Sequence, residues 1–436
     1  MNALRTVKGF ADIFAPSSNV YTFMENTARR VFGAHGYSEL RLPILEYTEL
    51  FQRGIGADTD IVRKEMFTFA DRKGRSLTLR PEATAGVVRA YMENGCRSRE
   101  KVSRFFTMGP MFRYERPQLG RMRQFHQINC ECLGADEPHA DAETLLMLVS
   151  FLSGLGLSNL TLKINTLGCR VCRPAYREAL SAFLRGLDPG KLCPDCRRRL
   201  GTNPLRILDC KEDACREATR GAPELRGYVC PDCVAHFDAV LAALKREEVG
   251  WELDPRLVRG LDYYMRTTFE VVSAGIGAQS SVAGGGRYDG LVRDLGGPDV
   301  PGIGFACGME RLALLIGETG AKGERPDFYF ALLDGKGADL ALSAARILRG
   351  QGLAGAADFS PGGLKGKLRV AVRNNAQFCM ILGEEELERE EIVIKNMDEG
   401  NQVSIPLSSL ADWAEIRAET KRETGRKGSC GTLPSM

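Results

Sequence analysis

The chain has 436 residues, of which 44% are hydrophobic and 26% are charged, and its formal net charge is +3. This length corresponds to about three domains, and this composition is typical of a globular protein with a large core. The small net charge excludes nucleic-acid binding through a chain-wide excess of basic residues, so such residues would have to be concentrated locally.

The beginning of the chain and its apolar content predict a cytoplasmic protein. The first residues, MNALRTVKGFADIF, contain no charged segment followed by an apolar leader. No apolar run approaches the roughly 20 residues needed to cross a bilayer. We therefore expect neither secretion nor membrane insertion.

The first part of the chain predicts consecutive strands with interspersed helices. Helical or alternating spacing of apolar residues marks each element. The expected elements are helices over 20–34, 82–91, 140–155 and 309–317 and strands over 66–70, 76–80, 102–115, 123–134, 159–165, 254–260, 267–273 and 281–290. Such an order favours an α+β fold with a mostly antiparallel sheet flanked by helices, formed by residues 1–167 and 235–320. A glycine-rich turn is expected before the last helix.

The pattern changes after a linker rich in glycine and charge, residues 317–326. Strand and helix then alternate, which predicts a small α/β domain over 326–416. Within it, residues 364–376 form a basic amphipathic helix in which Lys367 is expected to be one of several cations suited to phosphate. The polar tail, residues 417–436, is expected to be disordered.

Residues 168–234 form a cysteine-rich insertion in the first domain. Eight of the fourteen cysteines lie here, in closely spaced pairs: Cys169 and Cys172, Cys193 and Cys196, Cys210 and Cys215, Cys230 and Cys233. Such pairs predict structural Zn²⁺ sites, because tetrahedral thiolate sites use short loops between ligands. Which pairs combine cannot be deduced from spacing, and buried or redox-sensitive thiols are the alternative.

The segment GPMFRYERPQLGRMRQFHQI, residues 109–128, joins two predicted strands by a loop rich in arginine. An arginine side chain offers a planar fork of donors that suits phosphate oxygens, although a solvated hairpin is the simpler interpretation. This segment resembles motif 2 of the class II aminoacyl-tRNA synthetases in the form that histidyl-tRNA synthetases carry.

Four further segments strengthen the resemblance to the histidyl-tRNA synthetases. Residues 34–51 are similar to motif 1, residues 256–271 and 281–291 resemble the two histidine-specific motifs, and residues 302–314 resemble motif 3. The C-terminal domain resembles the anticodon-binding domain of several class II synthetases. The family implies a homodimer formed through motif 1 and an enzyme that activates L-histidine with ATP and transfers it to the 3′-terminal adenosine of its tRNA.

The resemblance also implies the roles of individual residues. For ATP, with its Mg²⁺, these are Arg113 on the α-phosphate, Glu115 at the adenine end, Phe125 stacked on adenine and Arg311 on the γ-phosphate. Arg259 would contact the α-phosphate and the histidine carboxylate, so Arg259 and Arg113 are the expected catalytic residues.

Histidine would be bound by six residues in the same resemblance, namely Glu82, Thr84, Gln127, Glu131, Tyr264 and Tyr288. Gln127 and Glu131 are four residues apart on a strand and therefore lie on one face. The loop residues Arg116, Gln118 and Arg123 are candidates for contacting tRNA.

The resemblance also allows a second function besides aminoacylation. A non-catalytic relative of these synthetases is the histidine-binding regulatory subunit of ATP phosphoribosyltransferase, which lacks the anticodon-binding domain and usually loses the arginines. This chain keeps Arg113, Arg259 and Arg311. The synthetase is therefore the expected function.

Overall fold

The computed structural model describes residues 4–57, 59–276, 281–320, 325–360 and 362–428. The chain forms two compact units, and the boundary between them falls between residues 321 and 322. This boundary lies inside the linker that the sequence predicts.

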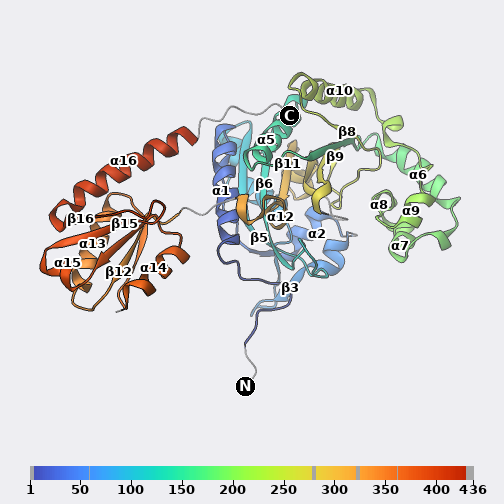
Figure 1. Ribbon diagram of the computed structural model, residues 1–436. Coiled ribbons are helices and arrows are strands. Elements are labelled where there is room, and N and C mark those ends of the chain that lie inside the picture. The colour runs from blue at the N-terminus through green and yellow to red at the C-terminus, as the bar shows by residue number, and fades with distance from the viewer. Residues whose placement is uncertain (1–3, 58, 277–280, 321–324, 361, 429–436) are drawn as a thin grey trace. The chain divides into compact units, whose positions relative to one another are not determined.

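The first unit is built on an eight-stranded sheet with the order β1-β5-β6-β11-β10-β9-β7-β8 (Figure 1). Its strands are β1 (Ser38–Glu39), β5 (Ser103–Phe112), β6 (Gln124–Leu133), β7 (Leu160–Thr166), β8 (Glu252–Leu253), β9 (Met265–Ser273), β10 (Ser281–Arg287) and β11 (Gly302–Gly308). Neighbouring strands are antiparallel except for the two outermost pairs, β1 with β5 and β7 with β8. The predicted antiparallel sheet is confirmed.

Helices cover this sheet and form its main core. They are α1 (Ser17–Ala34), α5 (Pro138–Gly154) and α12 (Met309–Gly320). Phe32 of α1 lies at the centre, with its ring 5.1 Å from Phe151 of α5 and 5.9 Å from Phe305 of β11. Burial of these aromatic rings fixes the helices against the strands.

A second, smaller sheet lies in the same unit and has the order β2-β4-β3. Its strands are β2 (Leu45–Tyr47), β3 (Phe67–Ala70) and β4 (Ser76–Leu79), and the helices α2 (Thr48–Ile55), α3 (Thr84–Glu93), α4 (Cys96–Arg99) and α11 (Leu291–Asp294) complete the unit outside the insertion. Paired residues place apolar side chains on one face of this sheet and threonines on the other.

The insertion between β7 and β8 is a group of short helices, coloured green in Figure 1. These are α6 (Arg173–Arg185), α7 (Pro194–Thr202), α8 (Leu205–Leu208), α9 (Asp213–Ala218) and α10 (Pro231–Arg246). Its apolar side chains, such as Tyr176, Leu180 and Ile207, belong to a core cluster that also contains Tyr264 and Tyr288.

The second unit is an α/β domain with a five-stranded sheet of order β13-β12-β14-β15-β16. Its elements are β12 (Phe328–Leu332), α13 (Ala338–Gly350), β13 (Gly355–Asp358), α14 (Leu364–Arg373), β14 (Phe378–Leu382), α15 (Glu384–Glu388), β15 (Glu391–Asn396), β16 (Gln402–Pro406) and α16 (Leu410–Gly428). The predicted α/β architecture is confirmed. Lys367 of α14, which we expected to be available to phosphate, is instead buried and pairs with Asp358 at 2.8 Å.

Three local expectations differ from the structure. The predicted disordered tail is helical as far as Gly428, because Ala414 and Ala418 pack into the core and Lys421 pairs with Asp327 at 2.8 Å; residues 429–436 lie outside the described residues. Residues 254–260 are not a strand. Residues 302–308 form the strand β11 and not a glycine-rich turn, because their backbone pairs along β6 and β10.

In the described part of the chain, no helix is long and apolar enough to span a bilayer.

Candidate active site

A pocket of about 920 Å³ opens on the main sheet of the first unit. Its floor comes from β6, β9, β10 and β11, one wall comes from the loop after β5, and another wall comes from the insertion. The residues expected to bind ATP and most of those expected to bind histidine meet here. Those that line the pocket are Glu82, Thr84, Arg113, Glu115, Phe125, Gln127, Arg259, Tyr264 and Arg311.

Arginines and an aromatic ring mark one end of the pocket. Arg113 donates through Nε to the carbonyl of Pro81 at 2.9 Å, and its guanidinium lies 5.3 Å from the ring centre of Phe125. Arg311, at the start of α12, donates to the carbonyl of Ser281 at 2.6 Å. Burial lowers the pKa of Arg311, although the group remains cationic at neutral pH. This end can hold a planar base and an anion.

Arg259 lines the pocket and is held from two sides. Its Nη1 lies 3.5 Å from Oε1 of Glu270 on β9, and its guanidinium is 5.6 Å from the ring centre of Tyr264. Gly284 of β10 leaves the space that the guanidinium fills, since a Cβ at that position would collide with it. The glycine therefore makes room for the arginine.

Another part of the pocket is lined by buried polar groups. Glu82 accepts hydrogen bonds from the backbone amides of Thr84 at 2.8 Å and Ala85 at 2.9 Å. Burial raises the pKa of this carboxyl. Gln127 and Asn129 each present a buried side-chain oxygen with no hydrogen-bond partner among the described residues. A buried acceptor without a partner costs folding free energy, so this part of the pocket suits a ligand that brings N–H donors.

Glu131 and Tyr288 lie behind the pocket surface and do not line it. Glu131 accepts from the Tyr288 hydroxyl and from Oγ1 of Thr84, the latter at 2.6 Å. Burial raises the pKa of Glu131 to about 8. Gly304 and Gly302 of β11 make space for these two side chains, because Cβ atoms there would collide with them. The carboxyl of Glu131 is occupied by its neighbours and is not directed at the pocket.

The arginine-rich loop divides into an inner and an outer part. Arg121 pairs with Glu115 at the pocket, whereas Arg116 and Gln118 are exposed. Gln118 and Arg121 exchange backbone hydrogen bonds of 2.9 Å that close the loop. Arg123 stacks on Tyr114 at 3.8 Å, so its side chain holds the loop in shape.

The sequence does not mark the wall of the pocket that comes from the insertion. Arg206, Asp209 and Lys211 line the pocket opposite the sheet, and burial raises the pKa of Asp209. Nothing in their local sequence marks them, because they reach the pocket only through the folding of the insertion. Glu270 and Tyr263 were also missed, although both lie in or beside the first histidine-specific motif.

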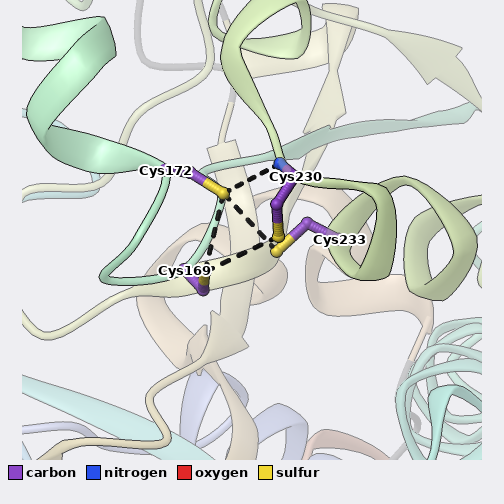
Figure 2. Close-up of side chains that lie close together, drawn as sticks. All are labelled: Cys169, Cys172, Cys230 and Cys233. Carbon is purple, nitrogen blue, oxygen red and sulfur yellow. Dashed lines mark hydrogen bonds between the residues drawn. The ribbon is translucent and has the colours of Figure 1, made fainter.

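The eight insertion cysteines converge in two groups of four. Cys169, Cys172, Cys230 and Cys233 form one quartet, in which the four sulfur atoms point toward a common centre (Figure 2). The other quartet consists of Cys193, Cys196, Cys210 and Cys215. Within each quartet the sulfur atoms lie within 4.8 Å of one another, so the donor set fits a metal ion that prefers thiolates.

The antiparallel sheet with this pocket is the catalytic fold of a class II aminoacyl-tRNA synthetase. The family model for histidyl-tRNA synthetase matches residues 9–312, and that for the anticodon-binding domain matches residues 328–417. The chain belongs to the histidyl-tRNA synthetase family. It activates L-histidine with ATP to histidyl-adenylate and transfers the histidine to the 3′-terminal adenosine of its tRNA.

Related proteins agree with this assignment over nearly the whole chain. A histidine–tRNA ligase of Nitratidesulfovibrio vulgaris (strain DP4) is 60% identical over 411 residues, which cover 94% of this chain and 98% of that protein. The corresponding protein of Geobacter sulfurreducens is 50% identical over 403 residues, covering 92% and 97%. The crystal structure of apo histidyl-tRNA synthetase from S. aureus is 34% identical, with a TM-score of 0.78 and coverage of 95% and 100%. These names and the anticodon-binding domain disfavour the regulatory-subunit alternative.

Proposed function

We propose that the pocket activates histidine with its arginines at the reacting phosphate and its buried polar groups around the amino acid. One observation carries this assignment: Arg259, further cations and an aromatic ring line the same pocket as unpaired buried acceptors. Arg113, Glu115, Phe125 and Arg311 would bind ATP. The amino acid would lie beyond Arg259.

The reaction requires a carboxylate to attack an anionic phosphorus atom. Negative charge grows on the phosphoryl oxygens as pyrophosphate leaves, so fixed cations directed at them stabilise the transition state by about 3 kcal/mol per donor. Arg259 and Arg113 fill this role, and Glu270 keeps Arg259 in position. No side chain forms a covalent intermediate.

The histidine end selects its substrate through hydrogen bonding and charge. Glu82 and Thr84 would receive the substrate ammonium, whose charge offsets the burial of the carboxylate. Gln127 and Tyr264 would contact the rest of the amino acid. Glu131 and Tyr288 would recognise the imidazole. Each would give up the hydrogen bond between them and form a hydrogen bond with the ring. An amino acid without matching groups leaves buried atoms unpaired, which can discriminate by roughly 10⁴.

ATP and Mg²⁺ are the general cofactors of aminoacyl-tRNA synthetases. Among the described residues, carboxylates do not converge into a group of three or more that would hold a metal ion. Mg²⁺ often uses one or two carboxylates together with substrate phosphates, so it would enter with the nucleotide, beside Glu115 and Glu310. When bound, it neutralises phosphate charge. The cysteines, by contrast, fit structural Zn²⁺.

The small sheet supports a homodimer. Its apolar face carries Leu45, Tyr47 and Phe69, whose exposed fractions are 38%, 54% and 48%. Large apolar side chains on an exposed sheet face favour burial against a partner, and a two-fold axis would place the same face of a second copy there. This face includes part of the segment that resembles motif 1.

We assign tRNA contacts to two regions. The C-terminal unit matches the anticodon-binding domain, and the exposed Arg116 and Gln118 would contact the acceptor end, with Arg123 shaping their loop. Protein synthesis is the process that this reaction serves, which supports a cytoplasmic location.

The test of the active site is ATP–pyrophosphate exchange with each of the twenty amino acids supplied singly. We expect exchange with histidine alone. Histidine binding without exchange would overturn the assignment of the arginines, and exchange with several amino acids would overturn that of the histidine end.

A further inference from the structure

The two cysteine quartets are nested in the sequence. The outer quartet combines the loop before α6 with the start of α10 and therefore closes the base of the insertion (Figure 2). The inner quartet combines Cys193 and Cys196 at the start of α7 with Cys210, between α8 and α9, and Cys215, within α9. Spacing alone left open which cysteine pairs combine. In the structure, the first cysteine pair along the chain combines with the fourth, and the second combines with the third.

The sulfur separations match a tetrahedral metal site. A Zn–S distance of about 2.3 Å places tetrahedral sulfur atoms roughly 3.8 Å apart. The observed separations are 3.5 Å for Cys169 and Cys172, 3.9 Å for Cys169 and Cys230, 3.8 Å for Cys172 and Cys233, and 3.9 Å for Cys193 and Cys210. A disulfide would need about 2.05 Å. The sulfur atoms are therefore arranged around a centre and not bonded in pairs.

Backbone amides also point at the sulfur atoms. The amide of Cys230 donates to Sγ of Cys172 at 3.1 Å, and the amide of Cys193 donates to Sγ of Cys215 at 3.1 Å. Donors around a thiolate disperse its charge and orient it toward a metal, as outer partners of metal ligands commonly do.

The inner quartet borders the active site directly. Cys193 and Cys210 line the pocket, and Asp209 and Lys211 flank Cys210 on the same wall. The helices that carry this wall, α8 and α9, have four and six residues. Helices of this length are not stable alone, so the wall depends on what fixes its ends.

Contacts from α7 connect the inner quartet to the catalytic sheet unit. Arg199 donates to Asp60 at 2.7 Å, and Asn203 donates to Asp262 at 2.7 Å. Asp262 belongs to the same loop as Arg259. A loosened inner quartet would therefore release both the wall and its attachment near Arg259.

We propose that each quartet binds one Zn²⁺ ion and that the inner ion holds residues 205–212 as a wall of the active site. Activation of histidine then depends on a metal that takes no part in the chemistry. This inference rests on the proposed location of the active site in this pocket.

The metal content of the purified full-length enzyme tests the sites. We expect two Zn²⁺ per chain by elemental analysis, one in the double variant Cys193→Ser/Cys210→Ser and one in Cys169→Ser/Cys230→Ser. Cys379→Ser, which removes a buried thiol of the C-terminal unit, is the matched control and should keep both ions. Wild-type enzyme without metal would overturn the proposal.

Hydrogen–deuterium exchange tests the role of the inner ion. In Cys193→Ser/Cys210→Ser, residues 205–212 should lose protection while β9 and β10 keep theirs, and the KM values for histidine and ATP should rise about tenfold. Unchanged protection and KM in a variant that has lost one ion would overturn the role.

Removal of metal from the wild-type enzyme covers the case in which the variants do not fold. Chelation should expose residues 205–212, and added Zn²⁺ should restore their protection. Failure of Zn²⁺ to restore it, or protection that chelation does not change, would contradict the proposal. A fully metallated enzyme without histidine-dependent exchange would instead overturn the proposed active site.

Discussion

The main sheet and the cysteine-rich insertion both line the active-site pocket, but they hold their side chains by different means. Beside the sheet, Arg259 and Glu82 lie in loops. Glu270 of β9 and Gly284 of β10 position Arg259, and the backbone amides of Thr84 and Ala85 hold Glu82. In the insertion, Asp209 and Lys211 lie between the short helices α8 and α9, on either side of Cys210 of the inner quartet.

One pocket can therefore combine a wall that strand pairing holds rigidly with a wall whose position depends on a cross-link or a metal. Strand register is over-determined because each of the pocket strands β6, β9, β10 and β11 pairs with two neighbours and buries one face in the core. A group of short helices has few such constraints and needs a cross-link or a metal, as small domains generally do. We expect changes in the sheet wall to affect chemistry and changes in the insertion wall to affect binding.

The largest effect is expected for Arg259→Ala. Loss of a fixed cation at the reacting phosphate should reduce pyrophosphate exchange about 10²- to 10³-fold while tRNA affinity stays nearly constant. Exchange kinetics and tRNA binding measure the two quantities, with Arg41→Ala, a surface arginine whose side chain is 83% exposed, as control. Parallel losses of exchange and tRNA affinity would remove this role from Arg259.

A smaller loss is expected for Gly284→Ala, because the new methyl group would displace the guanidinium of Arg259. A misplacement of this size should reduce exchange by roughly tenfold to 10²-fold. Gly33→Ala on α1, where a Cβ meets nothing within 4 Å, is the matched control. If Gly284→Ala were as active as that control, the sheet wall would tolerate movement that the structure excludes.

The pH dependence of stability should change in Glu131→Gln. Because the pKa of Glu131 is raised from 4.5 to about 8, the folded protein binds more protons than the unfolded chain within this window. The free energy of unfolding therefore falls as pH rises through the window, by at least about 1 kcal/mol from this group. Urea unfolding at pH 5 and pH 8 should show a smaller fall for the variant.

Glu49→Gln, a surface carboxylate whose side chain is 72% exposed, should leave that pH dependence unchanged. An identical fall in wild type and Glu131→Gln would show that the carboxyl of Glu131 is not perturbed in the folded protein.

The smallest effect is expected for Arg199→Ala in the insertion wall. Its ion pair with Asp60 is partly exposed, so its loss should raise KM about two- to fivefold with kcat nearly unchanged. Asp60→Asn should behave alike, and the double variant should be no worse than either single one. Additive losses in this cycle would mean that the two residues act separately.

Local patterns predicted much of the fold. The helices α1 and α5 and the alternation of strand and helix in the C-terminal unit follow from hydrophobic periodicity, which is a property of neighbouring residues. The error at residues 302–308 has a tertiary cause. Glycines there suggest a turn, but they are tolerated in β11 because Glu131 and Tyr288 occupy the space that side chains would fill.

The candidate site was predictable only as a set of motifs. Their resemblance to a known family brought Arg113, Arg259 and Arg311 into one hypothesis before any distance was known. The same reasoning placed Gln127 and Glu131 together because they share a strand face. The structure separates them, since Thr84 and Tyr288 close over Glu131 and leave Gln127 at the pocket surface.

The sequence by itself determined the family, the antiparallel sheet, the α/β C-terminal unit and the presence of four cysteine pairs. Tertiary structure alone decided which cysteine pairs combine and that Asp209 of the insertion lines the same pocket as Arg259. It also decided that Lys367 is buried and that the last helix continues to Gly428. The physical reason is the same in each case. Periodicity and spacing report on residues close in the chain, whereas these features depend on distances between segments that only packing brings together.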